Sequence, residues 1–313
     1  NYGSCLETYG ACTESVKREP SDGEFMHDTL ETGAKIKSAD RVLDLFEALA
    51  VEPAGLSFPE LIKRLGLPKS SLHGLLSVLV SRQYLAFDEE SRRYNIGVQL
   101  FDHGQAFLKQ HPEAREARAA MANVVAAVNE SVQLGVLRGA EGVNLATVEC
   151  SHPLRLQLAV GRHFAAYATS LGKVLLAHLP EAEVRARIGT GALEQFTEHT
   201  FRTADLLFEE LGRIRQRGFS LDTEEGIPGV FCVAVPIANG AGQVVTGMSV
   251  TIPTSRLNAD LLSRSLASLA TASLQISSRI GASTMPAQLQ MLTDAGYAAR
   301  ALNASQAAKW LAR

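Results

Sequence analysis

The chain has 313 residues, of which 46% are hydrophobic and 20% charged, and its formal net charge is −3 at pH 7. This composition is typical of globular proteins, and the length predicts two domains. The near balance of charge excludes a protein that coats itself with nucleic acid through bulk charge, but it permits a DNA reader with one small basic face. The apolar runs fall short of the roughly 20 residues of a membrane helix, so we expect a soluble protein without a membrane partner.

The four cysteines, Cys5, Cys12, Cys150 and Cys232, are too few for a disulfide scaffold and form no Cys-x-x-Cys pair. Residues 1–34 contain no apolar core of the signal-peptide type. We therefore expect a cytoplasmic protein that uses neither a metal nor a cofactor.

Residues 1–34 hold seven acidic and two basic residues without apolar periodicity, which predicts a disordered tail. The chain begins with Asn1, and Met26 follows the run Ser-Asp-Gly-Glu-Phe. We expect that residues 1–25 are an added or upstream segment and that translation naturally starts at Met26. An intact mass of the natural product that included residues 1–25 would contradict this.

Residues 35–97 have the pattern of a small helical domain. A first helix begins near Ser38, the expected N-cap, and a second lies between Ser57, which has capping-box spacing to Glu60, and Gly66, which ends it. A third is predicted by apolar residues at helical spacing, namely Leu72, Leu75, Leu76, Leu79 and Val80.

Two short strand-like runs follow, at residues 84–87 and 92–96, around a polar turn. Helix, helix, tight turn, helix and hairpin within about sixty residues make a winged helix-turn-helix, as such motifs are built. Residues 98–115 are the expected linker helix, within a helical region at residues 98–130 that is broken near His111-Pro112.

Residues 116–281 mix strands with helices, which predicts an α+β effector domain. The expected strands are residues 132–137, 143–149, 154–160, 230–238 and 244–253, and the expected helices are residues 170–179, 204–217 and 257–280. Residues 282–313 form an Ala-rich tail with one or two further helices.

These residues resemble the IclR-type bacterial transcription regulators. The first half matches that family's DNA-binding domain over Ser57-Phe-Pro-Glu-Leu-Ile-Lys-Arg-Leu-Gly-Leu-Pro-Lys-Ser-Ser-Leu-His73 and Arg92-Arg-Tyr-Asn-Ile-Gly97. The second half matches its effector domain over Ser151-His-Pro-Leu-Arg-Leu, Ala168-Thr-Ser-Leu-Gly-Lys173, Pro228-Gly-Val-Phe-Cys-Val-Ala-Val-Pro236 and Ser255-Arg-Leu257. The likeness runs from about Lys35 to Gly281.

The resemblance implies a homodimer, often a dimer of dimers, that binds double-stranded operator DNA and responds to a small-molecule effector. It also implies a GAF-like effector domain whose curved antiparallel sheet holds the ligand on its concave side. Repression and activation remain equally open, as do the effector and the operator sequence.

The outer side of the third helix carries the candidate DNA contacts, since the start of a recognition helix meets base edges while hydroxyls and Lys meet phosphates. The candidates are Lys69, Ser70, Ser71, His73, Gly74 and Ser77 on the helix and Arg92 and Arg93 on the wing. The alternative is a solvated polar face. Gly74 departs from the family, which usually has Arg there, and this predicts weaker DNA affinity or an altered site preference.

The resemblance also implies the effector contacts, which are Leu154, Leu156, Phe164, Thr169, Ser170, Leu171, Asp222, Cys232, Ser249 and Thr251. Ser249 and Thr251 have the same parity on one strand and so face the same side. A helix start at Ser170 favours an anionic group, which with one charged residue suits a small organic or aromatic acid. Cys232 could equally be a small buried hydrophobe, Asp222 a turn residue, and the two hydroxyls ordinary strand positions.

Enzymatic alternatives find little support. Residues 168–173 resemble a phosphate loop only superficially, because Tyr167 stands where the first glycine is required and Val174 replaces Ser or Thr. No Gly-x-Ser-x-Gly or His-Glu-x-x-His motif occurs, and the histidines lack metal spacing. The two hypotheses carried forward are a ligand-responsive DNA-binding regulator, which is not an enzyme, and a small-molecule sensor that acts through protein partners.

Overall fold

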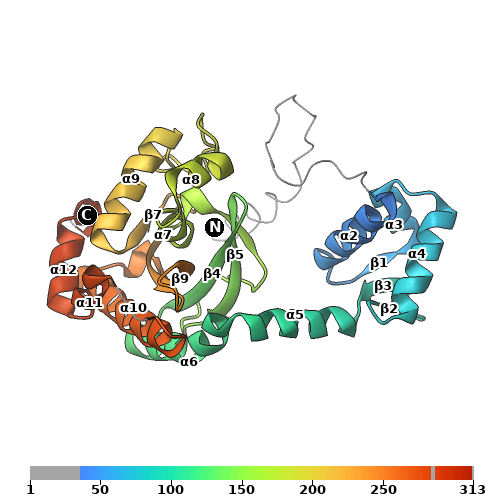
Figure 1. Ribbon diagram of the computed structural model, residues 1–313, viewed down its shortest axis with the longest axis horizontal. Coiled ribbons are helices and arrows are strands. Elements are labelled where there is room, and N and C mark those ends of the chain that lie inside the picture. Colours follow the sequence, from blue (N-terminus) through green and yellow to red (C-terminus); the bar gives the residue numbers. More distant parts are fainter. Residues whose placement is uncertain (1–35, 283–285, 312–313) are drawn as a thin grey trace. The chain divides into compact units, whose positions relative to one another are not determined.

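The computed structural model describes residues 36–282 and 286–311, and it contains two compact units that meet between Asp102 and His103 (Figure 1). The expectations for residues 1–34 and for a natural start at Met26 lie outside the described residues. The predicted domain bounds, including those of the linker at residues 98–115, stay predictions.

The first unit is the expected winged helix-turn-helix, with one element more than predicted. Three helices enclose a core of leucines, and a three-stranded antiparallel sheet in the order β1-β3-β2 lies beside them. Its elements are α2 (Lys37–Ala50), β1 (Leu56–Ser57), α3 (Phe58–Leu65), α4 (Lys69–Ser81), β2 (Leu85–Asp88) and β3 (Arg93–Ile96). The two residues of β1 are too few for any periodicity, so the sequence did not indicate this strand.

The turns of the first unit follow from individual residues. The Ser57 amide donates to Glu60 Oε2 at 2.8 Å, which completes the predicted capping box, and Gly66 ends α3 with a φ of +62°. The prediction of Ser38 as an N-cap is wrong. Ile36 occupies that position. The helix begins at Lys37, one residue before Ser38, so Ser38 lies in its first turn.

The second unit is built on a curved, six-stranded antiparallel sheet in the order β6-β5-β4-β9-β8-β7 (Figure 1). Its strands are β4 (Ser131–Arg138), β5 (Glu141–Val148), β6 (His163–Ala165), β7 (Ser220–Thr223), β8 (Val230–Ala238) and β9 (Val244–Pro253). Its helices are α6 (Pro112–Val128), α7 (Ser170–Leu176), α8 (Glu181–Ile188), α9 (Ala204–Arg217), α10 (Ala259–Arg279), α11 (Ala287–Met291), α12 (Ala295–Asn303) and α13 (Ala307–Leu311).

Each face of the large sheet carries its own core. On one face, alternate residues such as Met248, Val250 and Ile252 pack with α6 and α10 in the larger core. On the other face α7 lies against the sheet and joins α8 and α9 in a second core. Because strand side chains alternate, the residues between the larger-core positions point toward α7. We call this side the α7 face.

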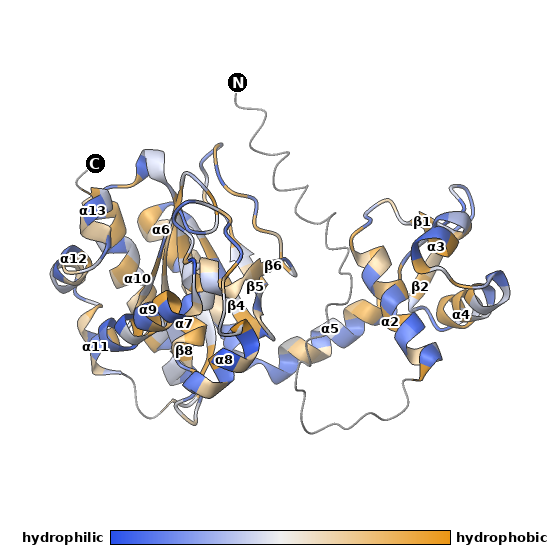
Figure 2. Cartoon of the chain, turned by 90° about the horizontal axis from the view of Figure 1, so that it is seen from above, coloured by the Kyte–Doolittle hydropathy of each residue, from blue (hydrophilic) through white to orange (hydrophobic). Residues whose placement is uncertain are grey.

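Helix α5 (Val98–Gln110) spans the boundary between the units and ends two residues before Pro112, at the predicted break near His111-Pro112. Figure 2 shows hydrophobic and hydrophilic residues alternating along it. Val98, Phe101 and Phe107 are exposed on this helix. Large exposed apolar side chains gathered on one helix are typical of a surface that contacts another molecule.

Three predicted elements differ from the structure. Residues 154–160 are not a strand, because the carbonyls of Leu158 and Ala159 accept from the Asn144 side chain at 3.1 and 3.0 Å and not from a neighbouring strand. The helix predicted over residues 170–179 ends at Leu176. The tail holds three short helices, α11 to α13, where one or two were expected.

Candidate functional site

The start of α4 presents a polar, exposed surface in the first unit. Lys69, Ser70, His73, Gly74 and Ser77 are exposed, whereas Leu72, Leu76 and Leu79 on the opposite side are buried. A Cβ added to Gly74 would have no atom within 4 Å, so this position leaves open space on the helix. The predicted residues therefore share one face, which is the geometry that a recognition helix needs.

Ser71 is half-buried at the edge of this surface and is held by a residue that the sequence did not nominate. Arg41 of α2 donates from Nη1 to Ser71 Oγ at 3.1 Å. Arg41 thus anchors the start of α4 to the first helix. It lies 30 positions away in the chain. No local pattern could have connected the two residues.

The two wing arginines have different surroundings. Arg92 is exposed with a φ of +57°, pairs with Glu89 at 3.0 Å and lies over the Phe87 ring. Arg93 donates to the Gly55 carbonyl at 2.6 Å and pairs with Glu60 at 3.3 Å. Arg93 is thus already engaged in joining β3 to the start of α3, whereas Arg92 and its partner Glu89 are both exposed.

In the second unit, strand pairing brings distant polar residues together on the α7 face. Asp222 pairs with Cys232, Cys232 with Thr251, and Ser249 with Gln133. Their strand neighbours lie in the larger core, so all five side chains point the other way. We call Gln133, Asp222, Cys232, Ser249 and Thr251 the polar patch. Cys232 is half-buried, whereas the other four residues are buried.

Two side chains of the polar patch donate hydrogen bonds to Thr251. Gln133 Nε2 donates to Thr251 Oγ1 at 3.1 Å, and Cys232 Sγ donates to the same oxygen at 3.4 Å. A hydroxyl oxygen has two lone pairs, so both are engaged and the Thr251 proton is left to donate elsewhere.

A buried ion pair borders the polar patch. Lys173 of α7 is 0% exposed and pairs with Glu225 in the loop after β7. The Glu225 amide donates to Asp222 Oδ1 at 2.7 Å, which ties the ion pair to the patch.

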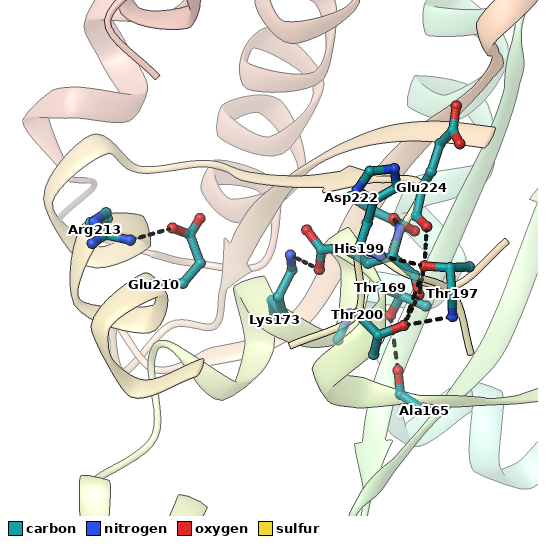
Figure 3. A network of polar contacts seen from close by, with 12 residues as sticks. Ala165, Thr169, Lys173, Thr197, His199, Thr200, Glu210, Arg213, Asp222 and Glu224 are labelled. Atoms are coloured by element: carbon teal, nitrogen blue, oxygen red, sulfur yellow. Dashed lines mark hydrogen bonds and ion pairs between the residues drawn. The ribbon is translucent and has the colours of Figure 1, made fainter. Parts of the chain in front are cut away.

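Threonines from a distant loop fix the position of Glu225. Thr197 Oγ1 donates to the Glu224 carbonyl at 2.7 Å and Thr200 Oγ1 to the Glu225 carbonyl at 2.6 Å, as Figure 3 shows. These two side chains hold the loop after β7 together with the backbone bond from the Glu224 amide to the Val230 carbonyl at 3.1 Å. The Lys173 ammonium also lies 4.9 Å from the centre of the Phe201 ring.

Burial, and after it the charge of Glu225, raises the pKa of Asp222 to about 8, against the lowering effect of Lys173 and of two backbone amides. Burial also raises the pKa of Glu225. Of the two carboxyls, Glu225 is the one that forms an ion pair with the Lys173 ammonium. Burial and the nearby Asp222 raise the pKa of the Cys232 thiol, which removes the thiolate that a nucleophile would need.

The predicted residues at the start of α7 are buried or half-buried beside the patch. Thr169 is the N-cap of this helix and accepts from the Gly172 amide at 3.1 Å, and Ser170 is buried. Leu171 fills the space over Gly135 and Gly247, where added Cβ atoms would lie 2.7 and 2.9 Å from its methyl groups. Leu171 therefore seats α7 on the sheet. Helix α7 begins at Ser170, where the sequence placed its start, and has seven residues.

The predicted apolar walls are more dispersed. Leu154 is 66% exposed, whereas Leu156 is half-buried in the same irregular segment. Phe164 lies on β6 against Gly142, where an added Cβ would overlap its ring. The structure thus brings Asp222, Cys232, Ser249 and Thr251 together, while Leu154 points to solvent.

Gln133, Lys173 and Glu225 were not predicted as site residues. Lys173 closes the motif that matched the family, but its buried pairing with a carboxylate 52 residues away is a property of the fold. Over the described ranges, no group of three or more His, Cys, Asp and Glu side chains could hold a metal ion. No helix in those ranges is long and apolar enough to cross a bilayer.

Both units match family models. Residues 38–89 match the IclR helix-turn-helix domain, and residues 105–278 match the model described as "Bacterial transcriptional regulator IclR C-terminal". The HTH-type transcriptional regulator BhcR of Paracoccus denitrificans is 32% identical over 228 residues, which cover 73% of this chain and 81% of BhcR.

Two solved structures share the fold. The IclR protein of Thermotoga maritima aligns with a TM-score of 0.65 and 24% identity, over 78% of this chain and 99% of that one. An IclR homologue of Microbacterium hydrocarbonoxydans, solved with 4-hydroxybenzoate, aligns with a TM-score of 0.70 and 20% identity, over 78% of this chain and 98% of that one.

These matches confirm the winged helix-turn-helix joined to an α+β effector domain, and the relatives are named as transcription regulators and not as enzymes. The two family models together span most of the described chain. The chain belongs to the IclR family of bacterial transcription regulators, with a helix-turn-helix DNA-binding domain and an effector-binding domain.

Proposed function

We propose that the chain binds operator DNA as a homo-oligomer through α4 and the wing, and that a small organic or aromatic acid on the polar patch controls this binding. The observation that carries the proposal is the polar patch itself. Buried hydroxyl, amide and carboxyl groups converge there beside a partly exposed thiol, on the face of the sheet that α7 covers. Few convergent polar groups among apolar walls are typical of sites for small molecules.

Two features support the DNA-binding half of the proposal, and a third supports the effector half. The exposed start of α4 combines Lys69 with hydroxyls and an imidazole, and Arg92 extends the surface onto the wing. The exposed apolar residues of α5 support assembly with a second copy, since a dimer reads two half-sites at once. The 4-hydroxybenzoate complex of the Microbacterium homologue supports an aromatic acid as the first compound to test.

The first experiment is a mobility shift of the full chain on DNA from upstream of its own gene, with scrambled competitor and moderate salt. A retarded, competitor-resistant band that changes with an added acid is the expected result. If that DNA gives only salt-sensitive binding, a genomic fragment pool replaces it. Absence of specific binding there too would favour the sensor that acts through protein partners, for which the bare Gly74 position on α4 would be the reason.

Replacing Cys232 by Phe tests the polar patch. The larger side chain fills the half-buried position between Asp222 and Thr251, so we expect the response to acids to be lost while the mobility shift remains. Cys150→Ala is the matched control, because the Cys150 side chain contacts Ser131 and lies outside the patch. A full acid response in Cys232→Phe would remove the patch from the site.

A further inference from the structure

A cavity in the second unit lies apart from the polar patch, at the end of the sheet where β4 ends and β9 begins. Its volume is about 560 Å³, within the range of about 300–1,000 Å³ that is usual for ligand sites. Most of its lining is apolar and comes from β4, β5, β9, α5 and α7, for example Val136, Val143, Val245, Phe107 and Leu175.

The cavity arises because β4 and β9 separate. The two strands stay paired as far as Gly135 and Gly247, and beyond this point β4 continues only with β5, and β9 only with β8. Each of these outer ladders has a register shift close to the separation, after Leu134 in β4 and after Ile237 in β8. Such shifts bend a strand and increase its twist, so the two halves of the sheet diverge here.

Leu171 of α7 separates the cavity from the polar patch. Its side chain lies over Gly135 and Gly247, the last paired positions of β4 and β9. Along β4, Gln133 lies on the patch side of this point and Val136 on the cavity side. None of the five residues of the polar patch lines the cavity, so ligands at the two places would contact different residues.

The charged side chains that line the cavity are two arginines, Arg138 and Arg187, and no carboxylate lines it. Arg187 is already paired with Glu183 at 2.6 Å. Glu141, which stands opposite Arg138 in β5, is hydrogen-bonded to His163 at 2.7 Å. In the part of the chain that the structure describes, the exposed Arg138 side chain forms neither an ion pair nor a hydrogen bond, so it is available to an anion.

We propose that this cavity is a second ligand site, which binds an aliphatic monocarboxylic acid such as a medium-chain fatty acid. The hydrocarbon chain fills the space between β4, β9 and α7, and the carboxylate pairs with Arg138. No hydroxyl or amide side chain lines the cavity, so a ligand body with further polar groups would lose its hydrogen bonds there.

The site would also bring a ligand into contact with α5. Phe107 of this helix lines the cavity and is 42% exposed, so a hydrocarbon chain would cover it. Helix α5 continues into the first unit, and none of its residues belongs to the polar patch. The inference goes beyond the proposed function and does not depend on it, because binding to the cavity is measured without DNA.

The experiment is equilibrium dialysis of the full chain with radiolabelled decanoate and, in parallel, decan-1-ol. We expect one saturable decanoate site per chain, with binding that strengthens by about fourfold per CH₂ from hexanoate to octanoate to decanoate. Arg138→Gln should weaken decanoate binding about tenfold and leave that of decan-1-ol unchanged. Arg118→Gln, at an exposed position of α6 outside the lining, is the matched control and should bind as the wild type does.

Val245→Trp fills the cavity, so it should lose decanoate binding, whereas Cys232→Phe, which fills the patch, should keep it. Urea unfolding shows whether each variant is folded, and the exposed Arg138 position keeps the test valid if Val245→Trp is not.

Three results would overturn the inference. These are no saturable decanoate binding to the wild type, the same decanoate affinity in Arg138→Gln, and loss of binding in Cys232→Phe. Decanoate binding that disappears as the chain concentration rises would mean that a second copy occupies the cavity, and would overturn it too. The operator shift and its response to 4-hydroxybenzoate stand or fall separately from each of these results.

Discussion

Gly74 lies exposed in the proposed DNA-contacting surface of α4 and contributes no side chain to it. We expect Gly74→Arg to strengthen operator binding and to steepen its salt dependence by about 0.9 in log–log slope, because one further phosphate is neutralised. Mobility shifts at several salt concentrations measure both quantities.

Gly74→Ala separates the charge from the helix. Replacing a mid-helix glycine by alanine stabilises a helix by about 1 kcal/mol but adds no charge, so the salt slope should stay that of the wild type. Equal operator affinity and equal slope for Gly74→Arg and the wild type would show that this side of α4 does not face DNA.

Adjacent residues on the wing provide a second test at this scale. Arg92→Gln removes an exposed charge, so we expect weaker operator binding, a shallower salt slope and unchanged stability. Arg93→Gln breaks the bonds to the Gly55 carbonyl and Glu60, so we expect a loss of about 1 kcal/mol in the stability of the first unit. Chemical denaturation and mobility shifts of both variants distinguish the two roles; the reverse assignment would contradict them.

Among the helices and strands, the prediction from sequence was most accurate where apolar residues recur at one period over many positions. Helices α4, α9 and α10 and the hairpin of β8 and β9 each extend over nine residues or more, and their apolar spacing marks them clearly. Strands β1, β6 and β7 have two to four residues, which carry too little pattern to be recognised.

Residues 154–160 show why pattern can mislead. Their alternation of leucines with polar residues is that of a strand, yet the carbonyl groups of this segment are satisfied by Asn144 and Thr147. Those two side chains lie more than ten positions earlier in the chain. A pattern read over a few neighbouring residues therefore could not show that Asn144 and Thr147 would bond to these carbonyl groups.

The residues of the candidate site likewise divide into those that the sequence indicated and those that it did not. Asp222, Cys232, Ser249 and Thr251 could be nominated through the family resemblance, and strand parity already placed the last two on one side. Gln133 reaches Thr251 across 118 positions, and Glu225 reaches Lys173 across 52. The register of the sheet brings the first pair together and the packing of α7 against the sheet brings the second, so neither partner of these residues could be predicted from sequence.

For the whole molecule, the raised pKa of Asp222 links folding of the effector unit to pH without any ligand. In the unfolded chain Asp222 loses its proton near pH 4, whereas the folded chain keeps it until about pH 8. The stability contribution is therefore complete below pH 4 and is lost as the pH rises to 8, at up to about 1.4 kcal/mol per pH unit.

Trp310 makes this measurable, since it is the chain's single tryptophan and lies in α13 near Phe231 of the larger core. Urea unfolding followed by its fluorescence at pH 5, 6, 7 and 8 should give a shallower decline of stability for Asp222→Asn than for the wild type. Asp205 is exposed on α9, so Asp205→Asn should keep the wild-type decline, and identical declines for all three proteins would mean that Asp222 is ionised in the folded state.

Leu171 packs over Gly135 and Gly247, which pair between β4 and β9, and this packing restricts the movement of α7. Because the Leu171 side chain occupies the space beside both glycines, α7 cannot slide along the sheet. Residues 154–160 are held differently, by hydrogen bonds to their carbonyl groups from the side chains of Asn144, Thr147 and Arg256. We therefore expect this segment to shift before α7 does.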